Sequence, residues 1–303
     1  SGTDPTDAGA DNALRDIPVL RSEGRTLSTR LGSAKATVTV AGRSVEAYAY
    51  EGRVPSSTWR MRPGDRLQVR AVNGVPEVSN LHFHGFHVSP EGKADNVLLT
   101  LDPGQSYEFD LTLPKDHPAG LFWYHPHVHG TTNPQVHRGL AGLIVVEGDH
   151  DQLPGIAGAR ERVLALQHWG FSDAGALVEA NPTSHVQTVN GQVNPTIDGR
   201  PGEIQLLRVG NMSNDGWYVL RLDGHKLHVL AEDGNSYTVP ESVDEFLLPP
   251  GKRVEVAVQL AAAGRYTLRN AGYTWGFGAT EAAELATFVV AGDPAPAAAL
   301  PTV

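Results

Sequence analysis

The sequence predicts an all-β protein built from two β-sandwich domains in tandem. Segments in which apolar and polar residues alternate recur along the chain, as in RLQVRAVN at 66–73, and this period of two is typical of half-buried strands. Turn-forming residues, among them 33 Gly and 21 Pro, separate these segments, and no long amphipathic helix is evident. The length of 303 residues suits two domains of ordinary size.

The first series of strand segments predicts a domain over residues 35–148. Its segments are 36–42, 45–52, 66–73, 106–113, 120–127 and 139–148. Residues 1–34 begin with a polar, acidic, Gly-rich stretch that cannot bury a core, so we expect a flexible N-terminal lead-in. Such a start is typical of a processed, exported protein and equally of a shortened chain.

A second series predicts another sandwich over 162–292, preceded by a linker at 149–161 and followed by a Pro/Ala-rich connector at 293–303. Its segments are 162–169, 203–211, 217–224, 226–234, 244–251, 253–260, 265–270 and 284–292. The two halves share an order of elements, which indicates a weak internal duplication. We match the turn Pro63-Gly64 with Pro250-Gly251, because an alternating strand follows each of them.

Composition argues against several functions. The formal net charge of −10 and the lack of a basic patch argue against nucleic-acid binding. No apolar run reaches the length of a membrane span. The absence of Cys excludes disulfides, thiolate metal ligands and cysteine nucleophiles in this chain. No GxSxG motif points to a hydrolytic serine site.

Eight of the 13 His lie between residues 82 and 137. His82 and His84 are two residues apart, so a strand directs both side chains to one face. His125 and His127 repeat this spacing, and Pro126 between them favours a sheet edge or a strand end. If the two pairs lie on adjacent strands, four imidazoles converge. Imidazole binds copper, zinc, iron and nickel, so we predict a metal site at these four residues.

The two His motifs also carry a family resemblance. NLHFHGFHVSPEG (80–92) and GLFWYHPHVHG (120–130) strongly resemble the multicopper oxidases, a laccase-like family of linked cupredoxin domains. The second half, with LRLDGHKLHVLAEDG and LPPGKRVEVAVQL, is similar to their second domain. The resemblance covers about residues 35 to 303. It implies two cupredoxin-like Greek-key β-sandwiches that correspond to the first two domains of a three-domain enzyme.

The resemblance also assigns roles to the four His. It places His82 on type 2 copper, and His84, His125 and His127 on the type 3 pair. Such enzymes oxidise phenols, amines or metal ions and reduce O2 to water, so O2 and a small reducing substrate are the implied reactants. The N-terminal stretch further leads us to expect an exported protein, whether periplasmic, cell-surface or extracellular.

This chain departs from the family pattern in two ways. The trinuclear cluster of the family uses eight His, and the HxxHxH and HCH motifs that supply the other four do not occur here. Without Cys the chain has no type 1 copper site. We therefore expect half of a trinuclear site, completed by a third cupredoxin domain or another subunit, and an isolated chain that is inactive or weakly active.

Two other interpretations stay open. The missing Cys is compatible with a non-catalytic copper-binding protein used in storage or delivery. A cupredoxin-like interaction module that has lost its metal is also compatible, although all four family positions are kept. Two-domain copper nitrite reductases share the domain count, but they need a Cys that this chain lacks.

Asp95 is the remaining candidate for a catalytic role. The resemblance places an acid there near the water channel of the cluster, where a carboxylate orients a His or relays protons. An Asx turn ahead of a strand explains Asp95 equally well.

We expect supporting or structural roles for the other side chains near the motifs and in the second half. His87 is a weaker ligand candidate because strand alternation turns it to the opposite face. His129 shares a face with His125 and His127, and we expect it to support the site or to belong to a loop instead of binding copper. Trp123 and Tyr124 are expected to pack the site, with Gln135 as a further neighbour. The structural His are expected to be His137 and, isolated in the second half, His168, His185, His225 and His228.

Overall fold

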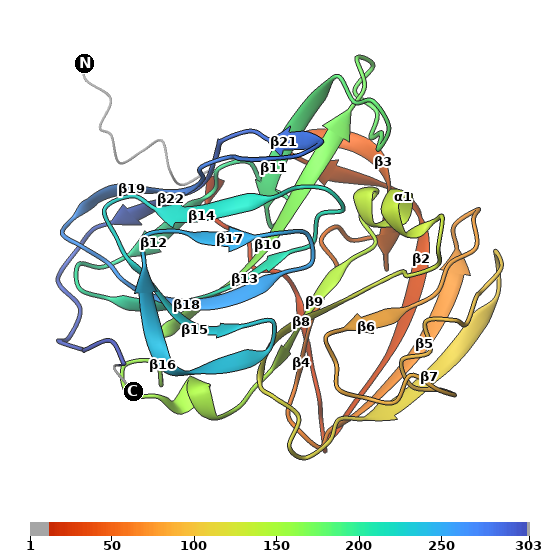
Figure 1. Ribbon diagram of the computed structural model, residues 1–303, viewed down its shortest axis with the longest axis horizontal. Coiled ribbons are helices and arrows are strands. Elements are labelled where there is room, and N and C mark those ends of the chain that lie inside the picture. The colour runs from red at the N-terminus through yellow and green to blue at the C-terminus, as the bar shows by residue number, and fades with distance from the viewer. Residues whose placement is uncertain (1–11, 302–303) are drawn as a thin grey trace.

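The computed structural model describes residues 12–301, and in it two β-sandwiches lie side by side (Figure 1). This confirms the predicted all-β fold class. Besides its strands, the described part of the chain has the short helix α1 (Thr132–His137) and the 3-10 turn η2 (Asp149–Gln152). Within the described range, no helix combines the length and apolar character needed to cross a membrane.

The first sandwich pairs a five-stranded sheet, in the order β1-β4-β9-β8-β6, with a four-stranded sheet, in the order β3-β2-β5-β7. Its strands are β1 (Val19–Arg21), β2 (Thr26–Val40), β3 (Arg43–Tyr50), β4 (Thr58–Met61), β5 (Arg66–Gly74), β6 (His82–His84), β7 (Ser106–Thr112), β8 (Gly120–His125) and β9 (Gly142–Val146).

The second sandwich pairs a six-stranded sheet, in the order β11-β10-β13-β18-β15-β16, with a five-stranded sheet, in the order β12-β22-β19-β14-β17. Its strands are β10 (Arg160–Phe171), β11 (Ser184–Val189), β12 (Thr196–Gly199), β13 (Ile204–Asn211), β14 (Tyr218–Leu222), β15 (Leu227–Glu232), β16 (Asn235–Val243), β17 (Phe246–Leu248), β18 (Arg253–Gln259), β19 (Gly264–Asn270) and β22 (Ala283–Val290). A separate hairpin joins β20 (Tyr273–Trp275) to β21 (Gly278–Thr280).

Strand β9 shows why one segment of the sequence is apolar without alternation. Ile144 and Val146 point into the core of the first sandwich. Leu143 and Val145 point the other way, into an apolar cluster that also contains Ala165 and Met212 of the second half. Since both faces of β9 are covered, every residue of the strand is buried. The same cluster joins the two sandwiches into one body.

The two sandwiches repeat one strand plan. In the first, β5 pairs in parallel with β2 and antiparallel with β7. In the second, β13 pairs in parallel with β10 and antiparallel with β18. The closing strands β9 and β22 likewise pair in parallel with β4 and β12. The internal duplication therefore extends to the sheet topology.

The predicted match between two Pro-Gly turns is wrong. Pro63-Gly64 precedes β5, whose counterpart β13 follows Pro201-Gly202, whereas Pro250-Gly251 precedes β18, whose counterpart β7 follows Pro103-Gly104. In all four turns Gly has a φ between 75° and 85° and a backbone hydrogen bond closes the turn. This is the type II turn that Pro-Gly favours. Matching by turn alone failed because the same turn occurs twice in each sandwich.

The predicted lead-in over 1–34 is also wrong for its second part. Residues 1–11 lie outside the described residues, but β1 and most of β2 fall within 19–34. Residues 26–34 of β2 pair in parallel with β5, and Leu27 and Leu31 are buried in the core. The polar start of the chain suggested that this segment is flexible. Hydrogen bonding along the parallel pair and the burial of the two leucines hold it in place instead.

Residues 291–301, the described part of the chain after β22, contain no strand but remain attached to the second sandwich. The Ala295 N–H donates to the carbonyl of Pro201, and Leu300 packs against a small apolar cluster.

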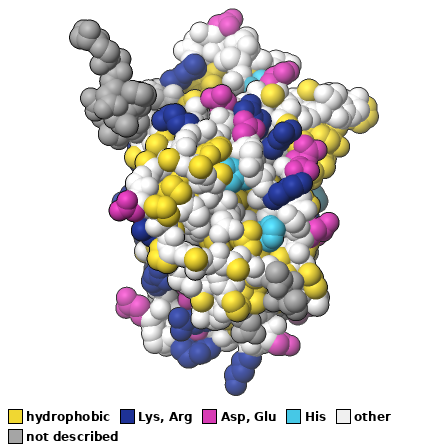
Figure 2. All heavy atoms as spheres, turned by 90° about the vertical axis from the view of Figure 1, so that its left-hand side faces the viewer, with side chains coloured by type: hydrophobic (Ala, Val, Ile, Leu, Met, Phe, Trp, Pro, Cys, Tyr) yellow, Lys and Arg dark blue, Asp and Glu magenta, His cyan; other side chains and the backbone are white. Residues whose placement is uncertain are grey.

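On the face drawn in Figure 2, acidic and basic side chains are interspersed among scattered apolar ones.

Candidate metal centre

Strands β6 and β8 bring the two His motifs together. They are antiparallel neighbours, and His82 lies directly opposite His125. This confirms the prediction that the motifs occupy adjacent strands. Strand alternation directs Phe83 into the core, where it is fully buried, and leaves His82 and His84 on the other face. Strand β8 ends at His125, as expected from Pro126, so His127 lies just beyond the strand.

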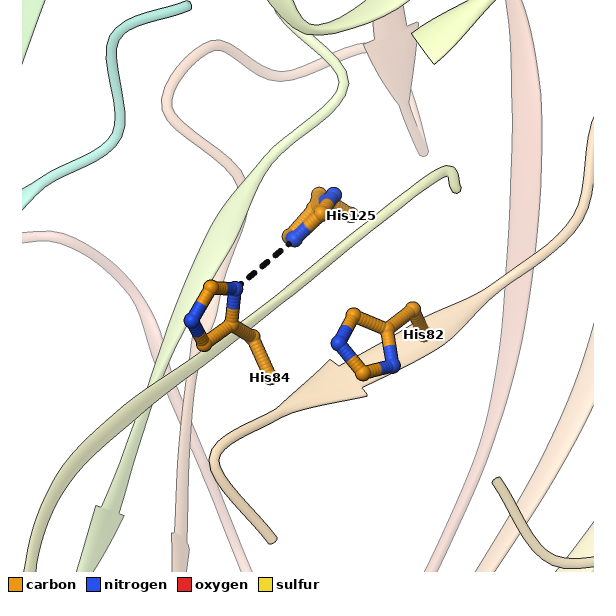
Figure 3. A group of neighbouring side chains, drawn as sticks. All are labelled: His82, His84 and His125. Carbon is orange, nitrogen blue, oxygen red and sulfur yellow. Dashed lines mark hydrogen bonds between the residues drawn. The ribbon is translucent and has the colours of Figure 1, made fainter. Parts of the chain in front are cut away.

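The four imidazoles form one group. The ring centroid of His82 lies 5.5 Å from that of His84, 5.3 Å from that of His125 and 4.9 Å from that of His127. Figure 3 shows His84 directed toward His125, with His84 Nδ1 and His125 Nε2 separated by 3.2 Å. One ring nitrogen each of His82, His84 and His125 lies within 4.8 Å of the others. His127 is adjacent to this triplet through its contact with His82.

Asp95 fixes the orientation of His82. The Nδ1–H of His82 donates to the Asp95 carboxylate at 2.9–3.0 Å, and the backbone N–H of Phe83 donates to the same carboxylate at 2.9 Å. The bond holds the proton on Nδ1 and leaves the Nε2 lone pair of His82 available. The alternative Asx turn belongs to the next residue, because the side chain of Asn96 accepts from the backbone N–H of Leu98.

Burial favours the neutral form of three of the four His rings. Burial, and then the charge of Arg253, lower the pKa of His84 to about 3. Burial also lowers the pKa of His125 well below its usual value, and that of His127 in the same direction. His125 donates its Nδ1–H to the carbonyl of Pro126 at 2.6 Å. Neutral rings with an oriented proton are the form that binds metal ions.

Asn80 joins three parts of the site, and the sequence interpretation did not identify it. Its amide group donates to the carbonyls of Val97 and Leu99 at 2.9 and 3.1 Å, which ties down the loop that carries Asp95. Its carbonyl oxygen accepts from the backbone N–H of His127 at 2.6 Å. An Asn two residues before the first His was the signal available, but its partners are far along the chain.

The His group opens into a cavity of about 340 Å³ between the two sandwiches. From the first sandwich, α1 contributes Thr132, Asn133 and Val136 to its wall. The second sandwich contributes Ser213, Asn214, Pro250 and Gly251. A carbon added at Gly251 would lie 3.3 Å from the His84 ring, so the second sandwich closely approaches that imidazole.

Arg253 of β18 contacts the backbone of the strand that carries His125. Its guanidinium donates to the carbonyls of Leu121 and Gly251, at 2.9 and 3.0 Å, and pairs with Asp233 at 3.1 Å. The side chain is almost fully buried. Because Leu121 belongs to β8, Arg253 links the strand that carries His125 to the second sandwich. The sequence interpretation missed this residue as well.

Several other predicted residues lie around the group. His87 and His129 are exposed and outside it; the ring of His87 lies near His117, and that of His129 is 6.1 Å from that of His127. Trp123 packs against His125 with ring centroids 4.0 Å apart. Tyr124 points to the opposite face, where it stacks on Trp59.

Gln135 is fully buried, but it contacts the loop before β6 and not the imidazoles. It accepts from the Ser79 hydroxyl and donates to the Val78 carbonyl. His137 is buried between the sandwiches, where it donates to the Asn214 side chain at 3.1 Å.

The His of the second sandwich are not all isolated. His225 has a structural position, since it donates to the Asp223 carbonyl and accepts from the Ala261 N–H. The expectation of isolation is wrong for His168 and His185, whose rings stack with centroids 4.6 Å apart. They lie on two paired strands, an arrangement that single-residue reasoning did not anticipate.

Comparison with known proteins gives a consistent result. Two family models described as multicopper oxidase match the chain, one over residues 33–151 and the other over residues 163–292. The multicopper oxidase mco of Staphylococcus aureus is 26% identical over 228 residues, which are 73% of this chain and 50% of that protein. The cell division protein FtsP of Dickeya dadantii is 28% identical over 280 residues, which are 88% of this chain and 58% of FtsP.

A solved structure shows the same arrangement of sandwiches. The laccase-like multicopper oxidase CueO from the lignin-degrading bacterium Ochrobactrum sp. superposes with a TM-score of 0.79 and 25% identity, covering 95% of this chain and 66% of that one. The chain thus spans between half and two thirds of the length of these three proteins.

Proposed function

Because this chain belongs to the multicopper oxidase family, we propose that it is the copper-binding two-domain part of a laccase-like oxidase and supplies half of a trinuclear copper site. The observation that carries the proposal is the convergence of His82, His84, His125 and His127 at the edge of the first sandwich. The proposed assignment puts His82 on type 2 copper and the other three on the type 3 pair.

The donor set fits copper. Four imidazoles and no thiolate surround the cavity, and imidazole is a ligand that copper binds well. The hydrogen bonds of His82 to Asp95 and of His125 to Pro126 fix one proton on each ring and leave the other nitrogen available. The neighbouring ring nitrogens of His84 and His125 are close enough to approach a common ion or adjacent ions.

Copper held by these four imidazoles would supply the transfer of electrons to O2. In this chain, the rigid β6–β8 pair orients the imidazoles, and Asp95 keeps the His82 proton on Nδ1. Trp123 and Pro250 give the cavity an apolar wall beside the imidazoles. Delivery of protons by Asp95 stays a prediction.

Electron entry and the remaining ligands require a partner in this proposal. Four His do not saturate three copper ions, and a chain without Cys cannot form a type 1 site. We infer that a third cupredoxin domain or another subunit covers the open cavity, and that the reducing substrate, a phenol, an amine or a metal ion, binds beside that partner. An exported location is part of the same proposal.

A non-catalytic copper-binding role is the second candidate. One relative of similar coverage is named as a cell division protein, so membership of the family does not by itself specify oxidation. The four-imidazole group is kept in either case, and both candidates predict copper binding. They differ in whether a completing domain produces turnover.

Copper loading tests the common part of both candidates. The chain is loaded with Cu(II), freed of excess metal and compared with the double variant His84→Gln/His127→Gln. We expect the double variant to lose up to about two copper ions per chain, because these imidazoles belong to the four-His group. His129→Gln, which changes an exposed His outside the group, is the matched control. Equal copper content in the wild-type chain and the double variant would refute the proposal.

Optical spectra and oxygen uptake separate the two candidates. The isolated chain should lack an intense blue band, because that band needs a Cys thiolate. Addition of a separately produced third domain from a related oxidase should give repeated O2 consumption with a phenolic reductant. A copper-loaded complex that consumes no O2 would favour storage or delivery.

A further inference from the structure

A second group of potential metal ligands lies at the junction of the two sandwiches. It comprises His168, His185 and Asp215, and one ligand atom of each lies within 4.8 Å of the other two. His168 Nδ1 is 3.0 Å from an Asp215 carboxylate oxygen. The rings of His168 and His185 lie face to face, 4.6 Å apart and 4° from parallel.

Strand pairing and two glycines bring these side chains together. In the β10–β11 pair, Gly170 lies opposite His185, and His168 is two residues before Gly170. The two His therefore share one face of the sheet, with no side chain between them. Gly216, beside Asp215, approaches His168 so closely that an added carbon would lie 2.6 Å from its Cβ. The approach of this loop to His168 requires a glycine there.

The three side chains range from buried to exposed, so an ion from solvent can reach them. His168 is buried, whereas His185 is exposed and Asp215 is half-buried.

We propose that His168, His185 and Asp215 form a second metal-ion site for a divalent transition metal of the Zn²⁺ or Cu²⁺ class. Two imidazoles and a carboxylate suit these ions, with water completing the coordination. An ordinary His–Asp ion pair explains His168 and Asp215 but not the second imidazole stacked beside them. Binding by both rings requires them to turn out of the parallel stack, and the exposed side chain of His185 has room to do so.

This site is separate from the four-His group and does not depend on the proposed function. Helix α1 lies between the two: Asn133 and Val136 line the first cavity, while His137 at the helix end accepts from the Gly170 N–H at 3.3 Å. Asn214, next to Asp215, contacts α1 through Asn133. Metal bound by Asp215 would therefore restrain the loop around Asn214, which also forms part of the wall of the first cavity.

Zinc binding to the full chain tests the proposal. The chain and its variants are dialysed against buffered Zn²⁺, and bound zinc is measured by elemental analysis. We expect His185→Gln and Asp215→Asn each to lose about one zinc ion per chain relative to the wild type. The control Ser184→Ala changes the exposed neighbour of His185 and should bind as much zinc as the wild type. Far-UV circular dichroism confirms that each variant folds.

The double variant His84→Gln/His127→Gln separates this proposal from the copper proposal. In the His84→Gln/His127→Gln background the zinc ion assigned to the second site should remain, and adding His185→Gln should remove it. Zinc content unchanged by His185→Gln in both backgrounds would overturn the second site and leave the copper proposal intact. In that case the three side chains serve only as an ion pair with a stacked ring.

Discussion

The two sandwiches share a strand plan but differ at one sheet edge. In the first, β6 is the last strand of its sheet and borders the cavity. In the second, the corresponding strand β14 is followed by an extra strand, β17, which pairs along its free edge. An open edge leaves room for side chains to face a partner or a ligand. The candidate metal centre therefore lies on the sandwich whose edge is uncovered.

The residues at the ends of the neighbouring strands reinforce the difference. Strand β8 ends at His125, and its counterpart β19 ends at Asn270. Asn270 is fully buried, accepts from the Val219 N–H at 2.8 Å and donates to Gln187 at 3.0 Å, so its amide is satisfied within its own sandwich. The His125 ring instead directs one nitrogen toward His84. The same fold position closes one sandwich and exposes ligands in the other.

Loss of the imidazoles at the open edge should have the largest effect of these changes, and it should appear in copper affinity. Replacing both His84 and His125 by Gln should lower copper affinity by more than about 100-fold, since changes to residues that only support ligands already cost about 10–100-fold. Competition titration with a chromophoric chelator measures this. His129→Gln should match the wild type. A double variant with unchanged affinity would show that the edge is not the copper site.

The second-largest effect is expected from Arg253, which links the two sandwiches. Arg253→Met removes two buried hydrogen bonds from a charged donor and an ion pair, and should destabilise the protein by about 3 kcal/mol. Urea unfolding measures the free energy change. Arg265→Met, an exposed arginine of β19, should change stability by less than about 0.5 kcal/mol. Equal stability of the two variants would mean that Arg253 does not hold the sandwiches together.

Loss of Asp95, which positions His82, should lower copper affinity less than loss of the ligands themselves. Asp95→Asn can still accept from the Phe83 N–H but loses the negative charge beside His82, so copper affinity should fall by roughly 10–100-fold. The same chelator titration applies. Asp102→Asn, in an exposed turn, controls for the loss of one charge. An Asp95→Asn chain that binds copper like the wild type would exclude a positioning role.

Substitutions in the corresponding Pro-Gly turns should lower stability the least, and by similar amounts in the two sandwiches. Pro63→Ala and Pro201→Ala each relax a type II turn, at counterpart positions of the two sandwiches, and should cost about 0.4–1 kcal/mol. Thermal unfolding compares the two variants. Clearly different losses would show that the shared strand plan does not imply shared energetics.

Much of the fold and the main site could be predicted from sequence because the evidence is local. The period of two in 66–73 and the HxH spacings follow from strand geometry, which directs residues i and i+2 to one face. Pro126 marks the end of β8 because proline lacks the donor that a strand interior needs. The four candidate ligands and the all-β class follow from such rules.

The tertiary structure alone decided which segments meet. The bond of Asp95 to His82, the three contacts of Asn80, and the approach of Asp215 to His168 each join residues that no short pattern relates. The true match of the four Pro-Gly turns also required the strand order. Backbone periodicity fixes the direction of a side chain within its own strand, whereas its neighbours depend on which strands pair and how loops satisfy their hydrogen bonds.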